Sequence, residues 1–264
     1  MEGLDWRVAA ILAVAFLASL LTLFSGFGLG TLLLPAFALA FPLEVAIAAT
    51  AVVHLANNLA KGALLGRAAH GPTVLRFGIP ATLAAVAGAG VLLLLEGGPA
   101  WRYDLGGPRA VTPIGLTVGL LVVAFALLDL VPALRRLQAG KRHLVAGGLL
   151  SGFFGGLSGH QGALRSVFLA KLGLSPRAFV ATGVMCAIFV DVARLAVYSG
   201  RHASDAASIT AAGGWGVLAG AVLMAFAGAF LGARLLPHAT VAGVRILVGA
   251  LLLAMGPLIA LGLV

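Results

Sequence analysis

The sequence predicts an all-α integral membrane protein that is built from two inverted repeats. Three observations carry this prediction. Hydrophobic residues make up 61% of the 264 residues, charged residues make up only 9%, and the mean hydropathy is +1.13. A soluble domain carries about a quarter charged residues, so these few charges cannot cover a water-facing surface. The apolar residues fall in blocks long enough to span a bilayer, and both halves of the chain share one block layout.

The first repeat, residues 1–131, opens with an apolar block at 7–41 that a glycine-rich run interrupts. The run reads Ser25-Gly26-Phe27-Gly28-Leu29-Gly30. Glycine can break a membrane helix and lets helices approach closely, so we predict a broken or re-entrant helical hairpin here. Three uninterrupted transmembrane helices are predicted to follow, at 43–66, 73–95 and 111–131.

A basic linker at 132–143 separates the halves, and its cations are Arg135, Arg136, Lys141 and Arg142. The second repeat, residues 144–264, opens with another interrupted apolar block, at 144–173. This interruption reads Gly155-Gly156-Leu157-Ser158-Gly159-His160-Gln161-Gly162. Three further spans are predicted, at 176–199, 208–235 and 240–263.

The local sequences of the two halves also match. Ser25-Gly26 aligns with Ser158-Gly159, and Ala49-Thr50 aligns with Ala181-Thr182. Gly30 aligns with Gly162 after a gap, and a proline begins the next helix in both halves. The chain therefore contains an internal duplication of about 130 residues, and such repeats are typical of transporters.

Loop charges predict how the chain is oriented in the membrane. The linker at 132–143 is the most basic loop, which the positive-inside rule places in the cytoplasm. The loop at 67–72 is then cytoplasmic and the loop at 96–109 lies outside. If the block at 144–173 enters and leaves on one side, four further cations lie at cytoplasmic edges: Lys171, Arg177, Arg234 and Arg245. If it crosses once, they lie outside. We favour the hairpin, which by symmetry gives inverted repeats with both termini outside.

The two interruptions are the best candidates for a functional site. Unpaired backbone N–H and C=O groups are not tolerated in lipid, so a non-helical stretch at membrane depth lies inside the protein or lines a wet cavity. A break also exposes a helix N-terminus, whose free N–H groups and dipole favour an anion. Two such ends at the bilayer midplane form a common substrate site in secondary transporters. The alternative is that the glycines only allow tight packing or a short turn.

A polar stripe at 50–61 predicts a helix face turned toward a cavity. Thr50, His54, Asn57 and Lys61 recur at steps of four and three residues, with Asn58 beside them. They therefore share one side of a helix. Alternatives stay open: the lysine could snorkel to the interface, the histidine could form an interhelical hydrogen bond, and the asparagines could join helices.

Arg165 is the leading candidate for binding an oxyanion, because a guanidinium donates several hydrogen bonds in a fixed geometry. A structural cation that holds loop carbonyls is the alternative. His160 and Gln161 lie in the break and could add hydrogen bonds. Ser158 and Ser166 could do the same, or could bond back to their own helix.

Asp191 and Arg194 lie three residues apart on one predicted helix and can form an ion pair. Such a buried pair is most often structural, and the alternative is a gate. Charged side chains within the hydrocarbon are costly and often functional.

Several functional classes lack support in the sequence. The net charge of +9 comes mainly from Lys and Arg at the ends of apolar runs, which indicates contact with anionic lipid headgroups rather than nucleic acid. The sequence has neither HExxH nor a cysteine cluster, so no metal and no cofactor is predicted. It has neither GxSxG nor a P-loop, so it predicts neither an enzyme nor an ATP-driven pump.

The motifs together resemble a known family. The Ser-Gly-Phe-Gly-Leu-Gly run with Pro35 and Ala49-Thr50 resembles the repeated signature of the TauE/SafE sulfite-exporter family. The runs at 159–166, 179–183 and 190–198 are similar to a subgroup of it, and the resemblance covers essentially the whole chain. It implies a multi-pass carrier in the inner (plasma) membrane that exports sulfite, sulfoacetate or other organosulfonates. The chain departs from the commoner pattern at His160-Gln161, where a glycine-rich run is usual, and this leaves the substrate open.

The resemblance also implies site residues at the two glycine-rich turns and the central threonines. Combined with the residue analysis, the predicted substrate-binding set is Ser25, Gly26, Gly28, Gly30, Thr50, His54, Asn57, Ser158, Gly159, His160, Gln161, Gly162, Arg165 and Thr182. The predicted proton-carrying or gating residues are His54, His160, Lys61, Asp191 and Arg194. Imidazole titrates near neutral pH, which suits a proton carrier.

The sequence thus predicts a secondary carrier whose partners are a small anionic substrate, the lipid bilayer and protons. Whether two copies form a homodimer stays open. A passive anion channel is the main alternative, since re-entrant loops also form selectivity filters. An intramembrane enzyme that uses His160 or Asp191, and a scaffold without a substrate, are further alternatives.

Overall fold

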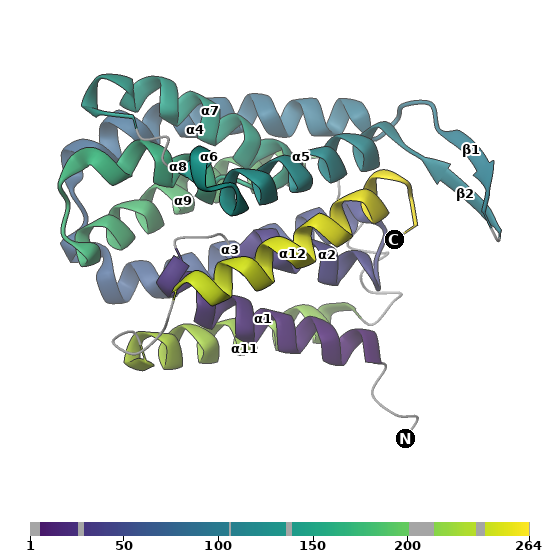
Figure 1. The fold of residues 1–264 in the computed structure, drawn as a ribbon, viewed down its shortest axis with the longest axis horizontal. Coiled ribbons are helices and arrows are strands. Elements are labelled where there is room, and N and C mark those ends of the chain that lie inside the picture. The colour runs from purple at the N-terminus through teal and green to yellow at the C-terminus, as the bar shows by residue number, and fades with distance from the viewer. Residues whose placement is uncertain are drawn as a thin grey trace.

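The chain folds into a bundle of helices that run roughly side by side, with one small β-hairpin at the end of the bundle (Figure 1). In the computed structural model, the described residues are 6–25, 29–105, 107–135, 139–200, 214–235 and 241–263. The predicted site residues Gly26 and Gly28 lie outside these ranges, as do residues 208–213 of the predicted span 208–235.

The described residues of the first half form six helices, a 3-10 turn and the hairpin. Their order is α1 (Trp6–Ser25), α2 (Leu29–Ala38), α3 (Leu43–Leu65), η1 (Gly66–Ala68), α4 (Gly71–Leu95), β1 (Trp101–Asp104), β2 (Pro108–Val111), α5 (Pro113–Leu130) and α6 (Pro132–Arg135). The second half contains η2 (Lys141–His143), α7 (Leu144–Ser158), α8 (Gly162–Leu169), η3 (Ala170–Leu172), α9 (Pro176–Ser199), α11 (Gly214–Leu235) and α12 (Val241–Ala260).

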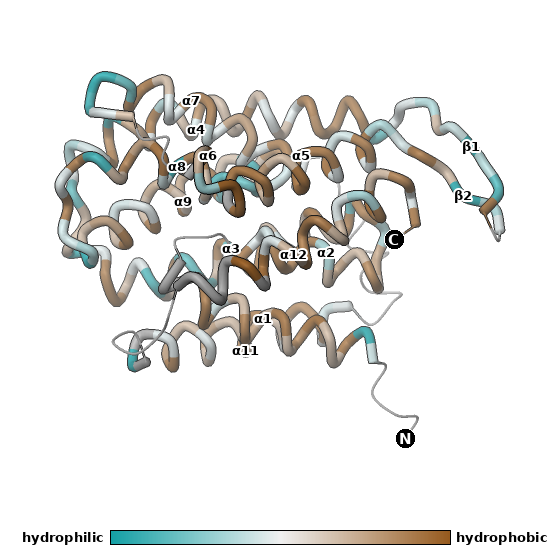
Figure 2. Tube along the Cα trace, in the orientation of Figure 1, coloured by the Kyte–Doolittle hydropathy of each residue, from teal (hydrophilic) through white to brown (hydrophobic). Residues whose placement is uncertain are grey.

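The helices have the length and surface of membrane spans. Four described helical segments are long and apolar enough to cross a bilayer: Leu43–Ala68, Gly71–Leu95, Pro176–Ser199 and Gly214–Gly232. Large apolar side chains lie on the outside of the bundle, such as Leu83, which is 67% exposed, and Leu94, which is 77% exposed. Figure 2 shows hydrophobic helices with polar residues gathered in the connections. The protein is therefore an all-α integral membrane protein, as the composition predicts.

Helix starts follow from caps that are readable in the sequence. Thr112 precedes Pro113 and accepts a hydrogen bond from the Gly115 amide. Ser175 precedes Pro176 and accepts a bond from the Ala178 amide. Proline at the first helical position loses no hydrogen bond, and the capping oxygen satisfies an amide that the helix leaves unpaired. These caps fix the starts of α5 and α9.

The loop at 96–109, which the sequence predicts to lie outside, includes most of a β-hairpin that ends at Val111. β1 pairs antiparallel with β2, and Trp101 lies opposite Val111. At the turn, the Gly107 amide donates to the Asp104 carboxylate, and Gly107 has φ +137. The Tyr103 hydroxyl donates to the Leu261 carbonyl, which ties the hairpin to the end of α12.

The break in the second half is a tight reversal. α7 ends at Gly159, whose φ of +80 is in the left-handed region that glycine tolerates. α8 begins at Gly162 and returns the chain toward the end where α7 starts. Accordingly, the Ala139 amide before α7 donates to the Val167 carbonyl near the end of α8. The first break separates α1 from α2, and its residues 26–28 lie outside the described ranges.

Close helix pairs hold the two halves of the chain together. α4 packs against α7, α1 against α11, α3 against α9, and α5 against α12, so each pair joins one half to the other. Glycines make these approaches possible. A Cβ at Gly152 of α7 would collide with the Ala81 carbonyl of α4, and a Cβ at Gly228 of α11 would collide with the Phe16 carbonyl of α1.

The two ends of the bundle differ in charge. α1 begins and α12 ends at the end that carries the β-hairpin (Figure 1). The exposed basic residues of the other end include Arg67, His70, Arg76, Lys141, Arg142, His143, Lys171, Arg177 and Arg234. We call this the basic end.

Candidate functional site

The polar stripe of α3 lies inside the bundle. Thr50 is 1% exposed and His54 is 4% exposed, although the helix crosses apolar surroundings. Asn57, Asn58 and Lys61 are also buried. Burial of polar groups is costly unless they are paired or functional. The Ser19 hydroxyl of α1 donates to the Asn57 side-chain oxygen over 2.9 Å, so part of the stripe joins helices.

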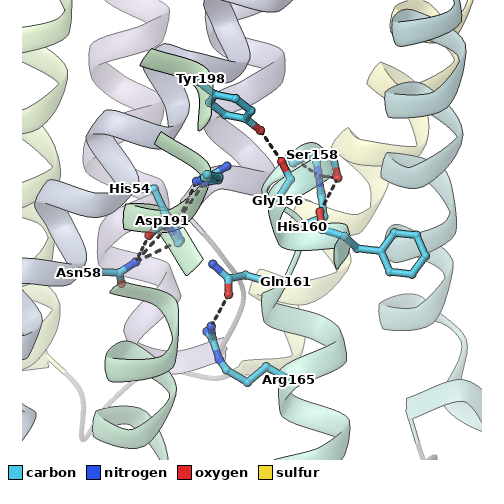
Figure 3. Close-up of polar contacts among 11 residues, drawn as sticks. His54, Asn58, Gly156, Ser158, His160, Gln161, Arg165, Asp191 and Tyr198 are labelled. Atoms are coloured by element: carbon cyan, nitrogen blue, oxygen red, sulfur yellow. Dashed lines mark hydrogen bonds and ion pairs between the residues drawn. The ribbon is translucent and has the colours of Figure 1, made fainter. Parts of the chain in front are cut away.

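Asp191 of α9 is the centre of a buried network that joins α3 to α9 (Figure 3). Its Oδ2 lies 2.6 Å from Nδ1 of His54 and accepts a hydrogen bond of 3.0 Å from Nδ2 of Asn58. Its Oδ1 accepts a bond of 3.1 Å from Nε of Arg194 and lies 2.8 Å from Nη2 of the same guanidinium. The carboxylate charge is therefore compensated from both helices.

Arg194 is fully buried, and Asp191 orients its guanidinium. Asp191 binds its Nε and Nη2, whereas Nη1 has no hydrogen-bond partner among the described residues. A Cβ placed on Gly159 would lie 2.6 Å from Nη1, so the guanidinium occupies the space that this glycine leaves. The Tyr198 hydroxyl, which donates to the Gly156 carbonyl, also interacts with the guanidinium. Arg194 thus faces the break in the second half.

The two breaks meet at this point. A Cβ on Gly30, at the start of α2, would lie 3.6 Å from the Gly159 carbonyl at the end of α7. The same position lies 3.5 Å from Cγ2 of Thr50 and 3.7 Å from Cδ2 of His54. Residues from α2, α3, α7 and α9 therefore surround one small region, which we call the junction. Its defining residues are Gly30, Thr50, His54, Gly159 and Arg194.

Gln161 lies beside the junction and is held in place by two neighbours. Its backbone carbonyl accepts from the Ser151 hydroxyl over 3.1 Å, and its Oε1 accepts from Arg165 Nη1 over 3.4 Å. In Figure 3 its amide nitrogen points toward the His54–Asn58–Asp191 network. Gln161 is 2% exposed, and its Nε2 has no hydrogen-bond partner among the described residues. It is a buried donor without an acceptor.

Arg165 is half-buried and packs on α9 beside Gly183. Its Nε lies 3.2 Å from the position that a Cβ of Gly183 would take, and it interacts electrostatically with Cys186 and Asp191. Lys61 of α3 is close enough for the two cations to repel each other. The interior on the basic side of the junction is therefore positively charged.

His160 is anchored to the break rather than to the α3–α9 network. Its Nδ1 lies 2.9 Å from the Ser158 carbonyl, and its ring stacks on Phe125 with a centroid distance of 5.9 Å. Its Nε2 has no hydrogen-bond partner in the described part of the chain.

Other predicted site residues have local roles. The Ser158 and Ser166 hydroxyls donate to carbonyls four residues earlier, at Phe154 and Gly162, which is the back-bonding alternative. The Thr182 hydroxyl accepts from the His70 amide over 2.9 Å, near the basic end, so Thr182 is separate from the junction. The Ser25 side chain, like Gly26 and Gly28, is outside the described part of the structure.

Asn58 of the network lies beside the predicted stripe but is missing from the predicted site set. Three further residues of this region are missing from that set: Ser19, Ser151 and Tyr198. Each is a single polar residue within an apolar span, and that isolation is the only signal the sequence gives. Among the described residues, no group of three His, Cys, Asp or Glu side chains is arranged to hold a metal ion.

Comparison with known proteins gives one match. No curated protein and no solved structure matches the chain significantly. The family profile described as "Sulfite exporter TauE/SafE" matches residues 11–258, which is nearly the whole chain and includes both breaks and the junction. Members of this family are membrane transporters rather than enzymes. The chain therefore belongs to the TauE/SafE sulfite exporter family of multi-pass membrane transporters.

Proposed function

We propose that this protein is a secondary carrier that exports a small sulfur-containing anion, either sulfite or an organosulfonate such as sulfoacetate. The observation that carries the proposal is the junction, where two helix breaks meet beside buried donors without acceptors. Among the described residues, the buried atoms without hydrogen-bond partners include Thr50 Oγ1, Asn57 Nδ2, His160 Nε2, Gln161 Nε2 and Arg194 Nη1. An anion would supply the acceptors that these groups lack.

The charge balance of the interior supports an anionic substrate. Among the described residues, the buried charged side chains are Lys61, Asp191 and Arg194. Half-buried Arg165 adds a third cation beside them. One carboxylate thus faces three basic side chains, and an anion would reduce the excess positive charge within a medium of low dielectric constant.

The inverted repeats belong to the same proposal. If α1 to α5 correspond to α7, α8, α9, α11 and α12, then the α1–α11 contact is the counterpart of the α7–α4 contact. The same correspondence exchanges α3 with α9 and α5 with α12. Each of these two contacts therefore maps onto itself, as a two-fold axis requires. We place the basic end in the cytoplasm, following the positive-inside rule. This orientation puts the β-hairpin and both termini outside an inner (plasma) membrane.

Proton coupling is the proposed energy source. The His54–Asp191 pair is buried at the junction and directly joined to Arg194, so a proton on this pair would change the charge that the substrate meets. His160 is the second candidate, since its unpaired Nε2 lies in the break.

Flux through reconstituted vesicles tests the proposal. Proteoliposomes loaded with sulfite or sulfoacetate should release it at a rate that saturates with concentration, and the unlabelled anion outside should accelerate exchange. A matched measurement of current separates the alternatives, because an ohmic current without saturation would identify a channel. Absence of both flux and current for sulfite, sulfoacetate, taurine, sulfate and thiosulfate, in folded protein, would reject anion transport.

A further inference from the structure

We propose that Arg194, and not Arg165, is the cation that binds the anionic head of the substrate, together with the side chains of Thr50 and Gln161. This inference rests on the proposed function and specifies its binding site. The three groups come from α9, α3 and the break between α7 and α8, so the site exists only when these elements are assembled.

The first step is the state of Arg194. Its guanidinium is fully buried, and Asp191 fixes its orientation through Nε and Nη2. Nη1 remains without a hydrogen-bond partner among the described residues and faces the Gly159 backbone at the break. A guanidinium held along one edge by a carboxylate and open at another is oriented for a second anion.

The second step is the pair of neutral donors. A threonine within a helix commonly returns its hydroxyl to a carbonyl one turn earlier. The Thr50 hydroxyl has no such partner in the described structure, although the residue is 1% exposed and packs beside Gly30. Gln161 Nε2 is likewise buried and unpaired, because its Oε1 is held by Arg165. Thr50 packs beside Gly30, which lies against the Gly159 carbonyl, and Arg194 packs against Gly159. Gln161 follows Gly159 by two residues in the same break.

The third step separates the two arginines. Arg165 is half-buried, uses Nη1 to hold Gln161, and packs against Gly183. Arg194 is eleven residues further along α9 than Gly183, or about 16 Å at 1.5 Å per residue. Arg165 is therefore a positioning residue that orients Gln161, and it lies on the basic side of the site.

The chemistry of the donors defines the ligand. Arg194, Gln161 and Thr50 supply three hydrogen-bond donors and one positive charge. A sulfite or sulfonate head has three acceptor oxygens on one sulfur, whereas a carboxylate has two oxygens in a plane. The site is therefore expected to bind methanesulfonate more tightly than acetate, which carries the same methyl group.

Ligand-induced thermal stabilisation of the purified full-length chain tests the inference. Sulfite, methanesulfonate and acetate are titrated, since stabilisation reports the ratio of ligand concentration to its dissociation constant. Thr50→Val keeps the side-chain shape and removes one donor, and should weaken sulfite binding at least about tenfold. Asp191→Asn with Arg194→Gln removes both charges together, leaves no lone buried charge, and should weaken binding at least about a hundredfold.

Arg165→Gln should weaken binding less than Thr50→Val does, because it only loosens Gln161. Arg177→Gln is the matched control, since Arg177 is exposed on the same helix as Arg194.

If Thr50→Val and the double variant bind sulfite as the wild type does, or if Arg165→Gln alone abolishes binding, this inference is wrong and the carrier proposal stands. If no anion stabilises the wild type, both fail. If the double variant does not fold, the sulfite affinities of Thr50→Val and Arg165→Gln still test whether the site lies at Arg194 or at Arg165.

Discussion

Gly119 of α5 and Gly256 of α12 pack against each other reciprocally. A Cβ on Gly119 would collide with the Gly256 carbonyl and the Ala260 amide, and a Cβ on Gly256 would lie 2.9 Å from the Gly119 carbonyl and 3.2 Å from the Val123 amide. Each glycine thus meets the carbonyl of the other and the amide four residues beyond it. This is the pattern that a local two-fold axis between the helices produces.

Gly119→Ala is expected to destabilise the protein by about 1–3 kcal/mol, the usual cost of overpacking a close contact. Thermal unfolding in detergent measures the loss. Gly90→Ala is the matched control, because Gly90 lies within α4 with nothing within 4 Å of an added Cβ. The better helix propensity of alanine should leave that variant as stable as the wild type, or more stable. Equal melting temperatures for Gly119→Ala and the wild type would contradict the close approach.

Gly159→Ala is expected to abolish transport. The substitution strains a residue with φ +80 and places a methyl group 2.6 Å from Arg194 Nη1. Gly173→Ala separates the two effects, since Gly173 has φ +68 but nothing within 4 Å of an added Cβ. Both variants bear a backbone cost of about 1–2 kcal/mol, and only Gly159→Ala adds the clash with the guanidinium. Sulfite flux should survive only in Gly173→Ala, and similar flux in both would show that the guanidinium position is unimportant.

His54→Gln is expected to remove the pH dependence of transport, because it breaks the bond to Asp191 and leaves no titratable ring at the junction. His160→Gln should retain the dependence, since His160 is bonded only to the break. Initial rates of sulfite efflux between about pH 5 and 8 bracket the titration of imidazole. Unchanged rates and pH profiles in both variants would reject a proton on either histidine.

Accessibility of introduced cysteines tests the orientation. In a Cys186→Ser background, Arg102→Cys marks the β-hairpin and Lys141→Cys marks the basic end. A membrane-impermeant maleimide added to intact cells should label the first and spare the second, which should react only after the membrane is opened. The reverse pattern would show that the proposed topology is inverted. Labelling of both cysteines in intact cells would show that the β-hairpin and the basic end do not lie on opposite sides of the membrane.

The helices were largely predictable because length, apolar character and caps are local features. The prediction of 176–199 matches α9 because Ser175 and Pro176 mark its start. The polar stripe of α3 was predictable because the spacing of its residues places them on one face of a helix. The spacing does not show which side chains that face contacts. The hairpin of β1 and β2 was missed because two strands of four residues leave too short an alternation to distinguish from a loop.

The centre of the site was only partly predictable. His54 and Asp191 are 137 residues apart, and their contact depends on how α3 packs on α9. The role of Arg194 depends likewise on the approach of Gly159, which no spacing in α9 reveals. Sequence reasoning favoured Arg165 because it follows the break directly, whereas the structure places the more deeply buried guanidinium at the meeting of the breaks.

The glycine-to-carbonyl packing of α7 on α4 and of α11 on α1 has a consequence for how such a protein arose. Each half uses the other half to cover the face that its own helices leave open, so neither half forms a closed bundle alone. An ancestral gene that encoded a single half could complete the same contacts only by pairing two copies, inserted in opposite directions under the proposed inversion. Gene fusion through the basic linker would then have fixed the stoichiometry and freed Asp191 and Arg194 to differ from their counterparts in the other half.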